Sequence, residues 1–369
     1  MCGRRGISIL LAAAILFSAS WLCGCSSSSR SPDLPPHLIS TPDADPERPI
    51  DGFESAALSP IDGELSDEQY RKRINELYTL VVDDRKKPLF AENDPVLPVY
   101  EAAIEILDRY ILNKWHTDEG GAYNTVHALH DYLVGYIDYD YDLYDAYREG
   151  DAVAESSPSF DMDGVFLYKL AVCDGLSRAF NFLCAVENIE SVRVTGTFAS
   201  VPHAWNRVAV DGMWYNVDVT ADIANYRVGS GGSYRKQLSH GFFMLSDETY
   251  KTFRPRLHWS DAQSNATVDY DYYADKTVTV DGTVYSCTIT SRQMLNALFD
   301  DINDADGKVG KIELKLAFSG KTNINDGDMY RAEIDEAYSR LKGVDFELTA
   351  TQRPYFQYPN GVYLFLMYD

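Results

Sequence analysis

Three residues in the middle of the chain, Cys173, His203 and Asp218, could together perform thiol acyl chemistry. In such chemistry a thiolate attacks an amide carbonyl, an imidazole moves the proton, and a carboxylate orients the imidazole. Apolar residues after Cys173 recur at helical spacing, so we expect this cysteine at the N-terminus of a helix. A helix N-terminus favours a thiolate and leaves a backbone N–H free to bind an oxyanion. The adjacent Asp174 partly opposes this effect because it adds negative charge.

The base and the acid can be paired through a predicted β-hairpin. Residues 201–210 and 213–220 are typical of strands, and Asp211-Gly212 between them is the two-residue signal of a type I′ turn. If the strand ends face each other across this turn, His203 and Asp218 are diagonal neighbours on one sheet face. Diagonal Cβ atoms lie about 7 Å apart, within reach of a hydrogen bond between the side chains. The register does not place Cys173 on that face.

The surrounding motifs resemble those of a known family. The motifs are Val172-Cys173-Asp174-Gly175, Val194-Thr195-Gly196, His203-Ala204-Trp205-Asn206 and Trp214-Tyr215-Asn216-Val217-Asp218-Val219-Thr220. Their order and spacing resemble those of bacterial transglutaminase-like domains, a branch of the papain-like thiol enzymes. The resemblance covers roughly residues 125 to 250. The resemblance implies that Cys173 is the nucleophile, His203 the base and Asp218 the orienting acid.

The chain departs from the family pattern in two places. Leu176 stands where the family often has an aromatic residue, and the bulky run 166–170 stands where a short approach of small residues is usual. The upstream oxyanion donor is therefore unassigned, with Tyr168 as a candidate at the substrate cleft. We expect Trp205 to serve as core and cleft wall.

The function expected from these residues is cleavage or transfer at an amide of a protein or cell-wall peptide, through an acyl-thioester. Hydrolysis is slightly favoured over cross-linking because no amine-binding site can be located. No cofactor and no metal are needed for this reaction. The family also contains catalytically dead domains, so a binding module that presents a tyrosine-lined cleft is the alternative.

The N-terminus has the pattern of an export signal. Arg4 and Arg5 precede an apolar run, and Leu22-Cys23-Gly24-Cys25 resembles the lipobox of bacterial lipoproteins. This predicts a signal peptide over residues 1–24 and a lipid on Cys25, which would hold the protein on the outer face of a membrane in the cell envelope. Residues 25–60 contain seven of the 15 prolines and are predicted to form a tether.

Cysteine usage leaves one pairing open. After removal of the signal, Cys25, Cys173, Cys184 and Cys287 remain, and the first is predicted to be acylated. Cys173 and Cys184 lie eleven residues apart on one predicted helix, about 16 Å along its axis, which excludes a disulfide between them. A bond between Cys184 and Cys287 stays possible.

The fold class expected is α+β. Residues 61–260 are predicted to form N-terminal helices that lead into a papain-like transglutaminase core, and residues 261–369 a small C-terminal α+β domain, with a ferredoxin-like arrangement as one candidate. The run 136–147 alternates tyrosine and aspartate and is interpreted as a loop. Thr290 with Gln293 is expected to cap a helix, and residues 312–318, 344–348 and 362–367 to form strands.

Two further groups of polar residues could suggest metal ions. His127, His130 and Asp131 could place ligands on one helical face, but the sequence offers no identifiable third ligand from elsewhere, so no zinc site is expected. His240 and His258 lack a partner pattern and are expected to serve structure. A calcium loop over residues 302–313, suggested by Asp304, Asp306, Gly307 and Glu313, is disfavoured because Ile302 occupies its first ligand position and Glu313 falls in a predicted strand.

The overall charge excludes one class of partner. The chain has 369 residues, 33 basic and 56 acidic side chains and a net charge of −23. Nucleic acid binding rests on neutralising phosphates with Lys and Arg, so nucleic acid is not expected as a partner. A neutral or basic peptide is the expected substrate, and the lipid is the expected contact with the membrane.

Overall fold

The computed structural model describes residues 49–61, 63–110, 121–150, 157–227, 234–237, 239–259, 265–305, 311–319, 330–338, 355–357 and 362–366. The predicted signal peptide, the predicted lipidation site Cys25 and the predicted strand at 344–348 lie outside the described residues. The end of the segment predicted as a tether is folded. Ile50, in the 3₁₀ turn Pro49–Gly52, is fully buried in the main core, and β1 (Ser55–Ala57) pairs with β2 (Lys87–Leu89).

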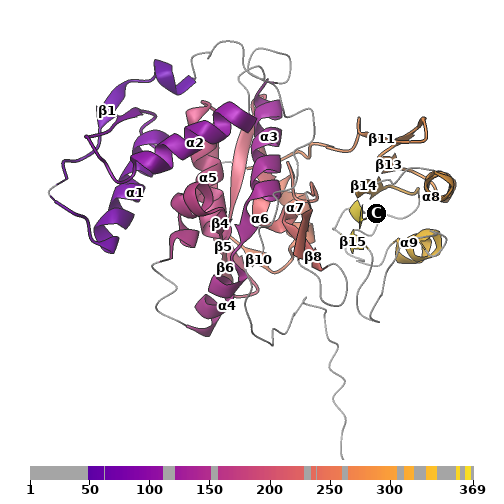
Figure 1. The fold of residues 1–369 in the computed structure, drawn as a ribbon. Coiled ribbons are helices and arrows are strands. Elements are labelled where there is room, and N and C mark those ends of the chain that lie inside the picture. Colours follow the sequence, from indigo (N-terminus) through magenta and orange to yellow (C-terminus); the bar gives the residue numbers. More distant parts are fainter. Residues whose placement is uncertain are drawn as a thin grey trace, which may run out of the picture. The chain divides into compact units, whose positions relative to one another are not determined.

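Three helices precede the candidate site, as the apolar periodicity predicts. They are α1 (Asp67–Val82), α2 (Leu97–Tyr110) and α3 (Gly121–Tyr136). Ser66 and Gln69 begin α1 with a reciprocal capping box. The buried faces of all three helices belong to the same hydrophobic cluster as α5 (Cys173–Val186), which therefore lies inside a shared core (Figure 1).

The interpretation of residues 136–147 as a loop is wrong. This segment forms β3 (Asp138–Tyr139) and α4 (Tyr141–Glu149). Asp140 begins α4 because its side chain accepts a hydrogen bond from the backbone N–H of Leu143 at 3.0 Å. Leu143 then buries its side chain against Val172, which gives the helix one apolar contact that the tyrosine-aspartate alternation conceals.

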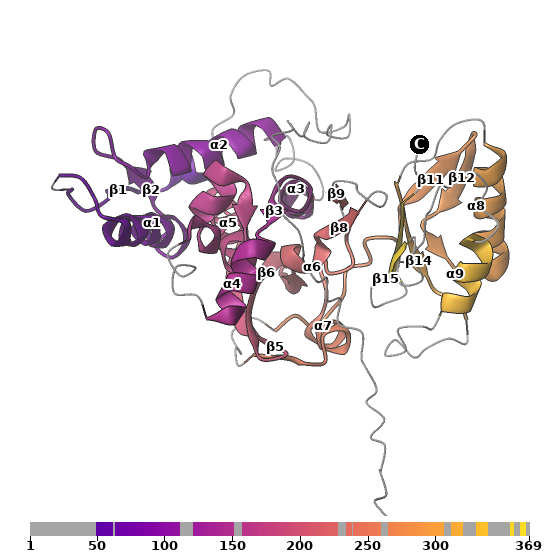
Figure 2. The same cartoon turned by 60° about the horizontal axis from the view of Figure 1, so that its bottom comes forward.

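A four-stranded antiparallel sheet carries the predicted hairpin. Its strand order is β10 (Leu257–His258), β5 (Ser191–Phe198), β6 (Val201–Val210) and β7 (Met213–Val217). The predicted register is confirmed, since Val210 pairs with Met213, and both turn residues have positive φ (52° and 77°), as a type I′ turn requires. Helix α5 packs against β6 (Figures 1 and 2).

The second strand of the hairpin ends earlier than predicted. After Val217 the chain leaves the sheet, and α6 (Val219–Asp222) begins with Asp218 as its N-cap. The elements that follow are β8 (Ala224–Arg227), β9 (Tyr234–Gln237) and α7 (Asp247–Phe253). Between α4 and α5 lie a 3₁₀ turn (Pro158–Phe160), a π-helical turn (Gly164–Tyr168) and β4 (Leu170–Ala171), which pairs with β3.

The C-terminal residues form a second hydrophobic cluster around helix α8 (Arg292–Asp304) and strand β14 (Lys311–Leu316). A hairpin of β11 (Thr277–Val280) and β12 (Thr283–Ser286) precedes them, and β13 (Thr288–Ile289), α9 (Arg331–Tyr338), β15 (Tyr355–Gln357) and β16 (Val362–Leu366) complete the described elements. Ser291, and not Thr290, caps α8, since its side chain accepts from the N–H of Met294.

The ferredoxin-like candidate is wrong. The strand order is β13-β14-β16-β15, and β13 and β14 are directly adjacent and parallel. In a ferredoxin-like fold the two strands of each βαβ unit are separated by another strand. The α8 connection here returns the chain to the neighbouring position, so the described fold is α+β with an unsplit βαβ unit.

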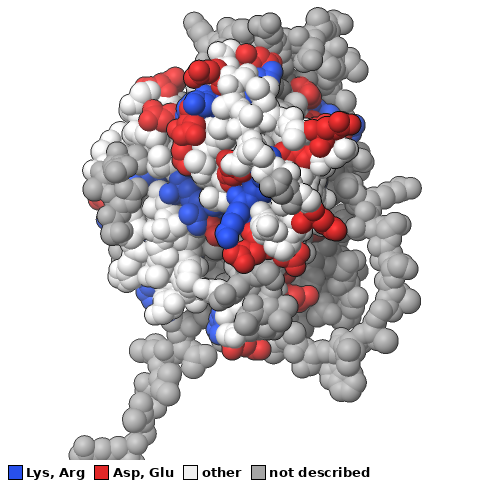
Figure 3. All heavy atoms as spheres, turned by 90° about the vertical axis from the view of Figure 1, so that its left-hand side faces the viewer, with Lys and Arg blue, Asp and Glu red and all other residues white. Residues whose placement is uncertain are grey.

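Charge on the surface is mixed. On the face drawn in Figure 3, basic side chains lie among acidic ones, so the net negative charge is not gathered in one acidic patch there. Within the part of the chain that the structure describes, no helix has the length and apolar character needed to span a bilayer.

Candidate active site

Cys173 lies at the first position of α5, as predicted from the spacing. The preceding Val172 is extended, and its N–H donates to the carbonyl oxygen of Ser159 at 2.9 Å, which fixes the approach of the chain to the helix. The Cys173 side chain is half-buried, whereas Cys184 and Cys287 are buried. All three are free thiols, so the Cys184–Cys287 bond left open by the sequence is not formed.

Gly175 allows α5 to begin where it does. A Cβ atom at this position would lie 2.5 Å from the carbonyl oxygen of Ser159 and 2.9 Å from that of Asp161. Such distances are too short for any real Cβ, and both neighbours are backbone atoms. Gly175, two residues after the cysteine, therefore allows the start of α5 to contact the segment that holds Val172.

His203 and Asp218 contact each other directly. Nε2 of His203 lies 2.9 Å from Oδ2 of Asp218. The imidazole also stacks on the indole of Trp205, with ring centroids 5.8 Å apart and planes 17° from parallel. Because Nε2 faces the carboxylate, Nδ1 is the nitrogen left for the thiol. Hydrogen bonding with Cys173 is one of the interactions that raise the pKa of the imidazole.

Asp218 is a buried carboxylate with several partners. Its Oδ2 accepts a hydrogen bond from the Tyr250 hydroxyl at 2.7 Å, and its Oδ1 accepts from the N–H of Ala221 at 3.0 Å. The guanidinium of Arg254 lies 3.6 Å from Oδ2. Burial alone would raise the pKa of Asp218, but the charges of His203 and Arg254 and the hydrogen bonds outweigh it and lower the pKa below its usual value.

The pairing with Asp218 also changes the pKa of His203, the predicted base. Burial disfavours the charged form of His203, but the Asp218 carboxylate and the hydrogen bonds with Asp218 and Cys173 raise its pKa to about 9. The imidazole is therefore protonated near neutral pH, and Asp218 is ionised. A protonated imidazole beside a thiol favours a thiolate–imidazolium pair.

The charge of Asp174 is offset. Its carboxylate contacts the guanidinium of Arg193 on β5. The expected opposition of Asp174 to a thiolate is thus reduced, because Arg193 brings a compensating positive charge. Asn206 of the same motif set is structural, since its Nδ2 donates to the carbonyl oxygen of Ser177 at 2.9 Å and joins β6 to α5.

The two residues expected at the cleft differ in exposure. Trp205 is 1% exposed and packs behind the imidazole, with Nε1 donating to Asn216 at 2.9 Å. Tyr168 is 62% exposed. Trp205 therefore lies in the core, as expected, and supports His203. The role of Tyr168 as an oxyanion donor stays a prediction.

Tyr139 is a site residue that the sequence interpretation missed. Tyr139 in β3 pairs with Ala171, two residues before the cysteine, so the pairing brings its backbone near the start of α5. Burial first, and then the charge of Cys173, raise the pKa of its phenol. The signal was hidden because this segment was interpreted as a loop.

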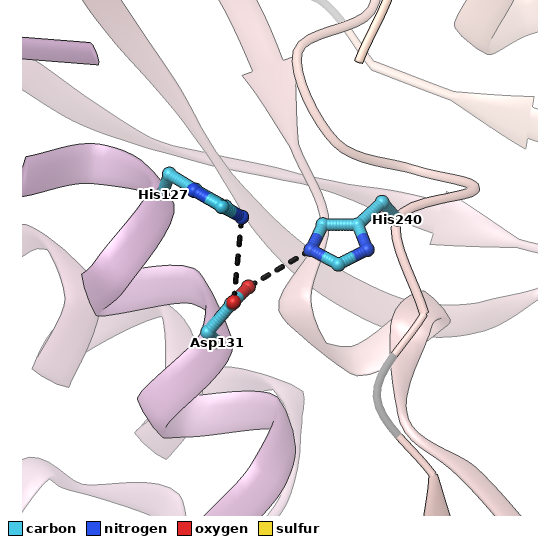
Figure 4. Close-up of side chains that lie close together, drawn as sticks. All are labelled: His127, Asp131 and His240. Atoms are coloured by element: carbon cyan, nitrogen blue, oxygen red, sulfur yellow. Dashed lines mark hydrogen bonds and ion pairs between the residues drawn. The ribbon is translucent and has the colours of Figure 1, made fainter. Parts of the chain in front are cut away.

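A second group of polar residues contains none of the three residues predicted to be catalytic (Figure 4). It consists of His127 and Asp131, one turn apart on α3, and His240 from the segment after β9, and we call it the histidine cluster. Their potential ligand atoms all lie within 4.8 Å of one another. The potential third ligand that the sequence did not reveal is thus His240, which was expected to serve structure.

Comparison with known proteins finds little similarity in sequence. No family model matches the chain, and no curated protein matches it. Among solved structures, a TGase (transglutaminase) is 17% identical, with a TM-score of 0.31 over 41% of this chain and 38% of that chain. A candidate cysteine protease from Cytophaga hutchinsonii is also 17% identical, with a TM-score of 0.24 over 33% of this chain and 37% of that chain. The chain thus spans less than two fifths of either protein.

Proposed function

We propose that the protein is a thiol enzyme of transglutaminase-like type that acts on an amide bond of a protein or cell-wall peptide. The observation that supports this most is the contact of 2.9 Å between His203 and the buried Asp218, beside a half-buried cysteine at a helix start. Carboxylate, imidazole and thiol in this order are the parts that activate a sulfur nucleophile.

The chemistry proceeds in two stages. Sγ of Cys173 bonds to the amide carbonyl carbon, and the oxyanion that forms faces the free N–H groups at the start of α5. His203 gives its proton to the leaving nitrogen, the C–N bond breaks, and an acyl-thioester remains on Cys173. A water molecule, with His203 now taking its proton, then releases the carboxylic acid and the thiol. Asp218 holds the imidazole throughout.

Tyr139 is the phenol best placed to assist this reaction. Its hydroxyl stays protonated at neutral pH because its pKa is raised. A neutral O–H beside the thiol can donate a hydrogen bond to the oxyanion, the role for which the sequence offered only Tyr168. We propose hydrolysis over cross-linking because no second site for an amine is evident in the described residues.

The location and the substrate class follow from the rest of the chain. A lipid on Cys25 would hold the protein on the outer face of a bacterial membrane, with residues up to about 48 as the tether. The net charge of −23 favours neutral or basic peptides over acidic ones. Replacing Cys25 with Ser should move the protein from the membrane pellet to the soluble fraction of the cell envelope. Retention in the membrane would contradict the lipid anchor.

Turnover of amides tests the proposal. The purified protein is incubated with a library of peptide amides, and new amines and acids are detected by mass spectrometry. We expect hydrolysis that Cys173→Ser and His203→Ala abolish and that His258→Ala, which changes an exposed histidine outside the site, leaves intact. Peptides that bind equally to the native protein and to Cys173→Ser without turnover would favour the binding module instead.

A further inference from the structure

The histidine cluster has the donors of a transition-metal site. Two imidazoles and one carboxylate converge from a helix and a facing segment, and none of them belongs to the Cys173, His203 and Asp218 set (Figure 4). Imidazole donors suit zinc and its neighbours in the first transition row, whereas magnesium and calcium prefer oxygen ligands. Three protein ligands with one open position is the usual arrangement of a zinc ion that retains a water molecule.

His127 supplies the independent observation. Its Nε2 is buried 3.3 Å from Oδ2 of Asp131, yet it makes no hydrogen bond to any described residue. A buried polar atom that makes no hydrogen bond costs free energy, so it calls for an explanation such as a bound ion. A tetrahedral ion with bonds of 2.0–2.2 Å separates its ligand atoms by roughly 3.3–3.6 Å, close to the distance that His127 and Asp131 already have.

His240 is held in position from its other side. Its Nε2 lies 2.9 Å from Oδ1 of Asp131, and its Nδ1 lies 2.9 Å from Oε2 of Glu313. Oε1 of Glu313 also accepts from the N–H of His240 at 2.8 Å, and the ring stacks on Tyr272 at 3.7 Å. A carboxylate on the far nitrogen of a ligating histidine is the usual support around a metal ion, because it fixes the ring and makes the near nitrogen a better donor.

The surrounding contacts connect the cluster with the backbone that carries Asp218. His130 lies 3.2 Å from Asp131 and, through Nε2, 3.1 Å from Asp222 at the end of α6. Asp222 accepts from the N–H of Phe242, and the carbonyl oxygen of Phe242 accepts from the N–H of Asp218. An ion bound to His240 would therefore brace the segment that holds the start of α6.

We propose that His127, Asp131 and His240 bind one divalent transition-metal ion, with Zn²⁺ as the best-suited candidate, and that the ion stabilises the packing of α3 against the segment around residue 240. The ion takes the place of the hydrogen between His240 Nε2 and Asp131 Oδ1, and that proton is released to solvent. The fourth ligand is water. The site does not depend on the thiol chemistry proposed above.

The test measures binding of Zn²⁺ itself. All variants carry Cys173→Ser, so that the thiolate cannot bind the ion together with His203, and all are stripped with a chelator before addition of Zn²⁺. We expect about one zinc per chain by elemental analysis after desalting, and a rise in the thermal midpoint, since a ligand that binds only the folded state stabilises it. His127→Ala should lose both effects, and so should His127→Phe, which keeps a ring against its aromatic neighbours.

Matched controls test whether zinc binds at the histidine cluster and not at another histidine, and whether the cluster prefers transition metals to Mg²⁺. His258→Ala removes an exposed histidine and should bind zinc as the parent does. Co²⁺ should give visible absorption typical of four-coordinate nitrogen and oxygen ligands, absent in His127→Ala, whereas Mg²⁺ should cause no shift that depends on His127. Zinc binding that is unchanged in both His127 variants, or no stoichiometric binding in the parent, would overturn the proposal and leave the cluster as a hydrogen-bonded network.

Discussion

At the scale of single residues, the central feature is a carboxylate that is buried and remains charged. Asp218 has no exposed surface, yet its two oxygens accept hydrogen bonds from Tyr250 and Ala221, contact His203, and lie near Arg254. A buried charge is tolerated only when it is paired and hydrogen-bonded. Several interactions thus fix the position of the carboxylate that orients the imidazole.

Replacing Asp218 should affect turnover far more than replacing its outer partner. Asp218→Asn keeps the shape but removes the charge that holds His203 protonated, and we expect the turnover rate to fall on the order of 100-fold or more. Tyr250→Phe removes a single hydrogen bond and should lower stability by roughly 1 kcal/mol with a smaller loss of rate. Steady-state kinetics of both purified variants checks this order, and equal rates for Asp218→Asn and the native protein would contradict it.

The raised pKa of His203 has a consequence for stability against pH. The pKa of His203 in the folded protein is about 9, above the ordinary value of about 6.5. The stability that its charged form contributes to folding is therefore complete below pH 6.5 and is lost as the pH rises through 9. Between pH 6 and pH 9.5 the free energy of unfolding of the native protein should therefore fall by on the order of 2 kcal/mol more than that of His203→Gln. Urea denaturation at both pH values measures the difference. Parallel loss in the two proteins would show that His203 is not stabilised in its charged form.

At the scale of elements, the hairpin illustrates what a sequence can predict. The positions of β6 and β7 and their register follow from alternation and from Asp211-Gly212, and the structure confirms them. The end of β7 could not be predicted, because Asp218 leaves the sheet to cap α6 by accepting from Ala221. Local pattern fixes a turn, whereas the exit from a strand depends on tertiary partners such as Tyr250.

The start of α5 gives a prediction that belongs to this scale. Gly175→Ala should push the helix away from the carbonyl oxygens of Ser159 and Asp161, with a loss of about 1–3 kcal/mol and a slower reaction of Cys173 with alkylating agents. Gly135→Ala is the matched control, because it lies in α3 with no atom within 4 Å of the added Cβ. It should be neutral or stabilising by up to about 1 kcal/mol. The same loss in both variants would mean that the close approach at Gly175 is not what matters.

At the scale of the whole molecule, Glu313 joins residues that are distant in sequence. It accepts hydrogen bonds from Tyr273, from the side chain of Ser239 and from both the backbone and the ring of His240. In the sequence pattern, Glu313 has a place only in the disfavoured calcium loop. Its partner His240 is 73 residues away, and His240 in turn reaches Asp131 over 109 residues, so no spacing rule could reveal either contact.

Removal of this carboxylate should weaken the molecule measurably. Glu313→Ala leaves several donors without an acceptor, and we expect a loss on the order of 2–4 kcal/mol in urea denaturation with a chelator present. Glu336→Ala is the control, since Glu336 is exposed and its ion pair with the exposed Arg292 lies at the surface, where such pairs contribute little. If Glu313→Ala and Glu336→Ala unfold at the same urea concentration as the native protein, Glu313 does not hold these segments together.

The account as a whole depends on Cys173 being activated by His203, and selective alkylation measures this most directly. Iodoacetamide is applied to the native protein near pH 6.5, and the modified residue is located by mass spectrometry. We predict rapid reaction at Cys173 and at least about tenfold slower reaction there in His203→Ala. Cys184 and Cys287 should stay unmodified until the protein is denatured, since burial raises their pKa values to about 12 and about 11. Cys173 reacting no faster than the other two thiols, and equally in His203→Ala, would contradict the account.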